Sequence, residues 1–163
     1  MRPRTRHAAL IVATALVAQA APAVAGPPFI TDDPEPVDEQ HWEINNAIIG
    51  TVTQSATTGA IPQIDANYGA LPNLQLHIQP QLAATTSSAT TRVGLGDTEI
   101  GAKYRFLQND PDGWQPMAAI YPLIELPTGD ENRGLGAGVT RAFLPVWIEK
   151  PLGKWIIDGG AGY

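Results

Sequence analysis

The feature that most constrains this chain is an alternation of apolar and polar residues, which dominates the sequence from Trp42 onward. It is clearest at residues 74–82, where leucine, isoleucine and proline alternate with glutamine and histidine. Successive side chains of a β-strand point to opposite faces of a sheet, so this segment predicts a strand with one apolar and one polar face. The same pattern predicts strands at residues 42–52, 63–68, 74–82, 97–106, 114–126, 139–148 and 155–163.

Charges on one face of the segment 97–106 indicate which kind of sheet these strands form. Inward charges would be costly in a small packed sandwich, whereas the wet lumen of a barrel can hydrate and pair them. The pattern therefore favours an all-β fold, an antiparallel up-and-down transmembrane β-barrel. The residues predicted to face the lumen are Gln75, His77, Gln79, Asp97, Glu99, Lys103 and Arg105.

The first 25 residues have the pattern of a secretory signal peptide: three early arginines, an apolar centre at residues 8–18, and small residues ending at Ala25. A glutamine and a proline interrupt the apolar run, which leaves it too short for a transmembrane helix. We expect cleavage between Ala25 and Gly26. Export would carry the chain to the bacterial cell outer membrane, where its partners would be outer-membrane lipid and the barrel assembly machinery.

Residues 26–40 contain four prolines and five acids, and we expect them to form an extended, solvated, periplasmic lead-in. They lack the glycine-centred spacing of a calcium-binding loop, so a calcium site is the weaker interpretation. The predicted organisation is therefore a signal peptide at 1–25, an acidic proline-rich lead-in at 26–40, and an incomplete outer-membrane β-barrel at 41–163.

Composition excludes several classes of function. The chain has no cysteine, which rules out a lipoprotein anchor, disulfides and thiolate metal sites. It has 10 Lys and Arg against 16 Asp and Glu, and this acidic balance argues against a nucleic-acid partner. Beyond the signal no apolar stretch reaches the length of a spanning helix, so membrane insertion would have to use β-strands.

Connection lengths and aromatic residues support the same topology. Longer polar connections at 53–62, 83–96 and 127–136 alternate with shorter ones at 69–73, 108–113 and 150–154, as the outer loops and periplasmic turns of a barrel do. With the lead-in in the periplasm, six aromatic residues fall at one level of the wall. This predicts an aromatic girdle made of Trp42, Tyr68, Tyr104, Phe106, Trp114 and Trp155.

Two features do not fit a regular barrel. Pro80, Pro116, Pro122 and Pro145 lie inside predicted strands, where each removes a hydrogen-bond donor, and residues 114–126 are apolar on both faces. Bulges, or a lumen partly lined by apolar residues, would accommodate both. About seven strands is also an odd number, whereas bacterial single-chain barrels close with an even one. We therefore expect an N-terminal barrel fragment.

Several stretches of the sequence resemble a known family, and together they extend over residues 26–163. The resemblance is to the exported proteins grouped as the meta-pathway of phenol degradation family, which are outer-membrane transporter-like β-barrel proteins. It implies a barrel that handles aromatic or other hydrophobic compounds, and it carries no catalytic residue. The stretches are Phe29-Ile30-Thr31-Asp32-Asp33-Pro34, Trp42-Glu43-Ile44-Asn45, Gly94-Leu95-Gly96-Asp97-Thr98-Glu99-Ile100-Gly101-Ala102-Lys103-Tyr104, Leu126-Pro127-Thr128-Gly129-Asp130, Leu144-Pro145-Val146-Trp147 and Gly153-Lys154-Trp155.

Motifs of catalysis and metal binding are absent from the sequence. It contains neither Gly-x-Ser-x-Gly nor His-Glu-x-x-His, and no histidine lies near Ser55, Ser87 or Ser88. His77 has only glutamines beside it, which are weak metal ligands, so we interpret it as a hydrated lumen residue. The sequence thus predicts no enzyme, no cofactor and no metal.

Three functions are consistent with these observations. The first is a porin-like channel or passive transporter for aromatic or other hydrophobic compounds. The second is an exported soluble β-sandwich or lipocalin-like binding protein, and the third is a structural barrel without conductance. The charges at 97, 99, 103 and 105 would form either a constriction that tunes permeation or an internal salt-bridge ladder, and the sequence leaves both open.

Overall fold

The computed structural model describes residues 32–87 and 89–163. The predicted signal peptide, its cleavage site and residues 26–31 of the predicted lead-in lie outside this range. All of the described residues fall within one compact unit. No helix among them is long and apolar enough to span a membrane.

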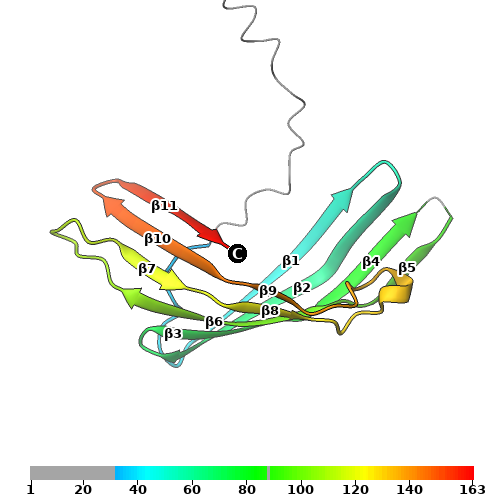
Figure 1. Ribbon diagram of the computed structural model, residues 1–163, viewed down its shortest axis with the longest axis horizontal. Coiled ribbons are helices and arrows are strands. Elements are labelled where there is room, and N and C mark those ends of the chain that lie inside the picture. The colour runs from blue at the N-terminus through cyan, green and yellow to red at the C-terminus, as the bar shows by residue number, and fades with distance from the viewer. Residues whose placement is uncertain (1–31, 88) are drawn as a thin grey trace, which may run out of the picture. The chain divides into compact units, whose positions relative to one another are not determined.

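These residues form one curled sheet of eleven strands, in which every strand pairing is antiparallel (Figure 1). The sheet is a half-barrel, and this confirms the predicted all-β, antiparallel fold class. One short 3-10 turn, η1, lies outside the sheet. The strands are β1 Trp42–Val52, β2 Ala56–Leu71, β3 Leu74–Gln79, β4 Gln81–Ser87, β5 Thr91–Leu95, β6 Thr98–Leu107, β7 Met117–Ile120, β8 Leu123–Leu126, β9 Arg141–Phe143, β10 Pro145–Leu152 and β11 Trp155–Gly162.

The strands follow one another as an up-and-down meander of seven rows: β1, β2, β3 with β4, β5 with β6, β7 with β8, β9 with β10, and β11. Each row pairs with the rows before and after it in the sequence; β2, for example, pairs with both β3 and β4. The rows correspond to the seven predicted strands. They divide into eleven elements partly because proline cannot donate to the ladder, and breaks fall at Pro80 and Pro122.

The long connections expected at 53–62 and 83–96 are wrong. Most of these residues continue the strands, so that Val52 pairs with Thr57 and Thr86 pairs with Thr91 in two extended hairpins. Threonine is polar but β-branched and fits a pleated sheet, which explains why a loop-like composition hides a strand. The longest remaining connections lie at 108–116 and 127–140.

The two faces of the sheet are inverted relative to those of a water-soluble protein. In β3, Gln75 and His77 are buried, while Leu76 and Ile78 are 47% and 46% exposed. In β6 the same alternation buries Lys103 and exposes its aromatic neighbours. Side chains crowd together on the concave side of a curled sheet, so the buried set defines what we call the inner face. The inner face is polar here, and the outer face is apolar.

One part of the inner face is apolar instead. Met117 and Ala119 of β7, Tyr121 just beyond it, and Trp147 of β10 are all buried. Ala119 lies directly opposite Trp147 in the sheet, which places this group in the last rows of the meander. A segment that is apolar on both faces is therefore compatible with the curled sheet, because its inner residues pack against one another.

Residues 32–40, which we call the inner segment, are extended, and Asp33, Glu35 and residues 38–40 are exposed, but the segment also contacts the sheet. Pro34 and Pro36 are buried, and the Val37 N–H donates to Gln75 Oε1 at 2.9 Å. Glu39 forms an isolated parallel bridge with Gly69 of β2. The polar inner face offers partners to an acidic, proline-rich segment, and the segment lies against it.

Substitution of Gly69 tests how closely the inner segment packs against the sheet. A Cβ at this position would collide with the backbone carbonyls of Val37 and Asp38. We expect Gly69→Ala to lower the free energy of unfolding by about 1–3 kcal/mol, the usual cost of overpacking, in urea titrations of the detergent-solubilised chain. The control is Gly50→Ala, whose Cβ would have Thr58 O at 3.9 Å as its nearest neighbour. Equal effects of the two substitutions would contradict the close contact.

Candidate functional site

A network of polar side chains occupies the inner face across β2 and β3. Asn67, Gln75 and His77 are each no more than 8% exposed. The Gln75 amide donates to Asn67 Oδ1 at 2.7 Å, and His77 Nδ1 lies 3.0 Å from the same oxygen. Buried polar groups of this kind must satisfy one another, and here Asn67 joins the other two. Gln75 and His77 were predicted to face the lumen; Asn67 was not singled out.

His77 lies between two carboxylates. Its Nδ1 is 3.1 Å from Asp65 Oδ1, and its Nε2 is 3.3 Å from Glu99 Oε1. The second contact lacks hydrogen-bond geometry, so Nε2 has no hydrogen-bond partner among the described residues. The ring of Tyr121 meets the imidazole edge-on, with 5.7 Å between centroids. Within residues 32–87 and 89–163, no group of three or more acidic, histidine or cysteine side chains could hold a metal ion.

Two cations, Lys103 and Arg105, lie beside this network on β6. Lys103 Nζ is 3.0 Å from Asp32 Oδ1 and lies over the Tyr121 ring, 5.2 Å from its centroid. Arg105 Nη1 is 3.6 Å from Glu35 Oε1. The carboxylates that reach both cations thus come from the inner segment, not from Asp97 or Glu99 as a ladder along the strand would require. Sequence analysis missed this pairing because its partners were assigned to a solvated lead-in.

Asp97, also predicted to face the lumen, holds a connection in place. Its carboxylate is buried and accepts hydrogen bonds from the backbone N–H groups of Gly129, at 2.9 Å, and Ala137, at 2.6 Å. The Thr128 hydroxyl donates to Gly96 O at 2.9 Å. Two stretches singled out in the sequence, around residues 97 and 128, therefore meet in space. A Cβ at Gly129 would collide with neighbouring backbone, so the approach requires glycine there.

The connection held by Asp97 folds back over the sheet. It contains η1, Glu131–Arg133, which Asp130 caps by accepting from the Arg133 N–H. Arg133 Nη2 donates to Val93 O of β5 at 3.1 Å, and Leu135 is buried. The predicted outer loop is therefore braced against β5 rather than free.

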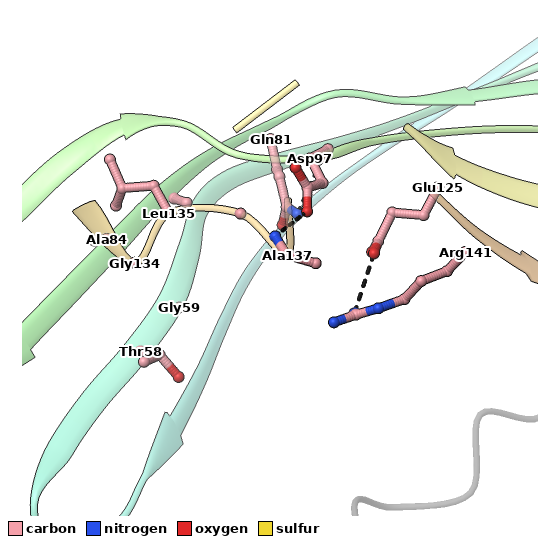
Figure 2. Close-up of a pocket in the computed structure, with 12 residues that line it drawn as sticks. Thr58, Gly59, Gln81, Ala84, Asp97, Glu125, Gly134, Leu135, Ala137 and Arg141 are labelled. Atoms are coloured by element: carbon pink, nitrogen blue, oxygen red, sulfur yellow. Dashed lines mark hydrogen bonds and ion pairs between the residues drawn. The ribbon is translucent and has the colours of Figure 1, made fainter. Parts of the chain in front are cut away.

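A pocket of about 420 Å³ lies between this connection and the inner face (Figure 2). The ion pair between Arg141 and Glu125, 3.1 Å long, lies in its lining, which also includes Asp97. Glycine, alanine and backbone atoms supply much of the rest, so the pocket offers hydrogen bonds and one ion pair. Its residues are Thr58, Gly59, Gln81, Ala83, Ala84, Asp97, Glu125, Gly134, Leu135, Gly136, Ala137 and Arg141.

The remaining predicted residues occupy the wall itself. Gln79 is half-buried and lies opposite Glu99 in the pairing of β3 with β6. Trp42 lies opposite Tyr68, with 4.7 Å between ring centroids. The six aromatics of the predicted girdle lie toward the same end of the strands, where β1 and β11 begin and β2 and β6 end. Of these, Trp42, Tyr104, Phe106, Trp114 and Trp155 are more than half exposed. The girdle itself stays a prediction.

Comparison with known proteins identifies a family. The family model described as "Putative MetA-pathway of phenol degradation" matches residues 25–163. No curated protein matches the chain. The matched range begins beside the predicted cleavage site and includes the inner segment, all eleven strands and the pocket, so every site described above lies within it.

The role of Asp97 can be tested by hydrogen exchange. Asp97→Ala removes the acceptor of two backbone N–H groups, each worth roughly 1–3 kcal/mol when left unsatisfied. We expect amide exchange in the peptide covering residues 127–138 to become at least about tenfold faster, measured by mass spectrometry. Asp112→Asn, an exposed residue of the connection 108–116, should leave that peptide unchanged. Unaltered exchange in Asp97→Ala would exclude the bracing role.

Proposed function

Because the chain belongs to this family, whose description links it to phenol degradation, we propose that it is an outer-membrane channel or passive transporter for small aromatic or other hydrophobic compounds. The observation that carries the proposal is the inversion of the sheet, with buried polar side chains inside and exposed apolar ones outside. In this proposal the signal peptide exports the chain, and no catalytic step is involved.

The outer face supports a membrane location. Large apolar side chains stand exposed along β3, β6, β8 and β10, although a soluble protein seldom exposes a continuous apolar surface of this size. In lipid the same surface has no such cost, and the backbone of a paired sheet needs no water. Exposed residues on these strands include Leu76, Ile78, Ile100, Tyr104, Phe106, Ile124 and Ile148.

The soluble alternatives fit less well. A β-sandwich covers its apolar face with a second sheet, whereas the part of the chain that the structure describes forms one sheet. A lipocalin-like binder would need an apolar interior for an apolar ligand, but Gln75, His77 and Lys103 line this one. A structural barrel without conductance shares the inverted sheet, so the choice between it and a channel rests on measurement.

The inner face also supports the proposed solute class. Tyr121 and Trp147 are buried there, and Tyr121 lies beside His77 and Lys103. Aromatic rings favour edge-on and offset contacts with other rings, worth roughly 0.5–1.5 kcal/mol each. In this proposal, rings on the inner face favour an aromatic solute over an aliphatic one of similar size.

Lipid exposure of the outer face can be tested with adjacent residues. Ile78→Arg places a charge on the exposed apolar face and should cost roughly 2–4 kcal/mol if that face meets the middle of a bilayer. Gln79→Arg places the same charge on the opposite face, across from Glu99, and should cost much less. The measurement is the fraction folded in lipid vesicles during a urea titration. A similar loss in both variants would argue against a lipid-facing surface.

Conductance tests the channel itself. In planar bilayers, a closed barrel that contains this half-barrel should give discrete current steps, and phenol should reduce the open current at an about two- to tenfold lower concentration than cyclohexanol. Tyr121→Leu should narrow that difference because it removes a buried ring from the inner face. If folded protein gives no current, the structural-barrel alternative replaces the channel; if phenol and cyclohexanol act alike, the aromatic preference is lost.

A further inference from the structure

We infer that Lys103 and Arg105 form a carboxylate-binding site on the inner face, and that the inner segment occupies it as an internal ligand. The inference deepens the proposed function, since solutes would meet the same face. It identifies small carboxylates as the ligand class, and the inner segment as the part of the chain that competes with them for the site.

The sheet by itself leaves both cations without an acid. In the register of the strands Lys103 lies opposite Gln75, and Arg105 lies opposite Ala119. With the inner segment in place Lys103 is 3% exposed, and Arg105 otherwise donates to neutral acceptors, the oxygens of Asn73 and Pro72 and the sulfur of Met117. A buried charge is costly unless an opposite charge and hydrogen bonds compensate it. The sheet therefore strongly favours binding of an anion at this position.

The inner segment supplies anionic side chains to both cations, and its backbone holds these side chains in place. Lys103 Nζ contacts Asp32 Oδ1 at 3.0 Å and Asp33 Oδ1 at 3.8 Å, while Glu35 pairs with Arg105. The Glu35 N–H donates to Asp33 Oδ1 at 2.8 Å, which forms a local turn. The buried Pro34 and Pro36 restrict the chain on either side of Glu35, so ordering it costs less entropy than usual. The carboxylates are presented as a preformed group.

The attachment of the segment suits a ligand that can be displaced. It is no strand of the sheet. Beyond the ion pairs and the buried Pro34 and Pro36, it is held by hydrogen bonds from Lys103 Nζ to the Glu35 carbonyl and from the Val37 N–H to Gln75, and by the backbone contacts around Gly69. A tethered ligand acts at an effective concentration in the millimolar range. A free carboxylate must therefore compete against it, and the parent chain should bind one weakly.

Calorimetric titration with benzoate tests the site on the full chain in detergent micelles at low salt, with benzamide as the uncharged probe of the same shape. The triple variant Asp32→Asn, Asp33→Asn, Glu35→Gln removes the internal carboxylates but keeps the oxygens that form the turn. It should bind benzoate at least about tenfold tighter than the parent. Glu35→Gln alone, a milder change, should give a smaller gain in the same direction.

Matched controls separate the site from general charge effects. Asp38→Asn with Glu39→Gln neutralises two exposed acids of the same segment and should leave benzoate binding at the parent level. Adding Lys103→Gln and Arg105→Gln to the triple variant should abolish the gain. A folded triple variant that binds benzoate no tighter than the parent, or binds benzamide equally well, overturns the inference. Binding is read in micelles, so a lack of conductance would remove the proposed channel and leave this site intact.

Discussion

Backbone pairing in a single antiparallel sheet is the constraint on which the rest of this structure depends. Because side chains alternate across a paired strand, one register places the glutamine, histidine and charged side chains of β3 and β6 on the inner face and their large apolar side chains outside. A slip by one residue would bury leucines where Gln75 and His77 now bond to Asn67. The hydrogen-bonded network inside and the apolar surface outside thus depend on one another.

Contacts between residues that are far apart in sequence then complete the inner face. Asp97 secures the connection 127–140, and Lys103 and Arg105 secure the inner segment. In each case a charged group on the wall meets a segment that has no place in the sheet. The wall therefore supplies both the framework and the attachment points for the segments that lie against it.

Sequence patterns predicted those features of the fold that depend on residues close to one another in the chain. Alternation within β3 and β6 was enough to place Gln75, His77 and Lys103 on one face, and the meander followed from the order of the strands. Composition failed at the threonine-rich hairpins, where polar residues form strands. The sequence could not reveal that Asp97 bonds to Ala137, 40 residues away, or that Asp32 reaches Lys103, 71 residues away, because no local period records such contacts.

The separation between Asp32 and Lys103 also has a consequence for the order of assembly. The inner segment precedes all eleven strands in the chain, yet its anchors are on β6, which must already be paired with β3 for Lys103 to face inward. Closing so large a loop early would cost entropy with no contact to offset it. The residues of the inner segment are thus among the last to reach their final position, and they do so after the strands beneath them have paired.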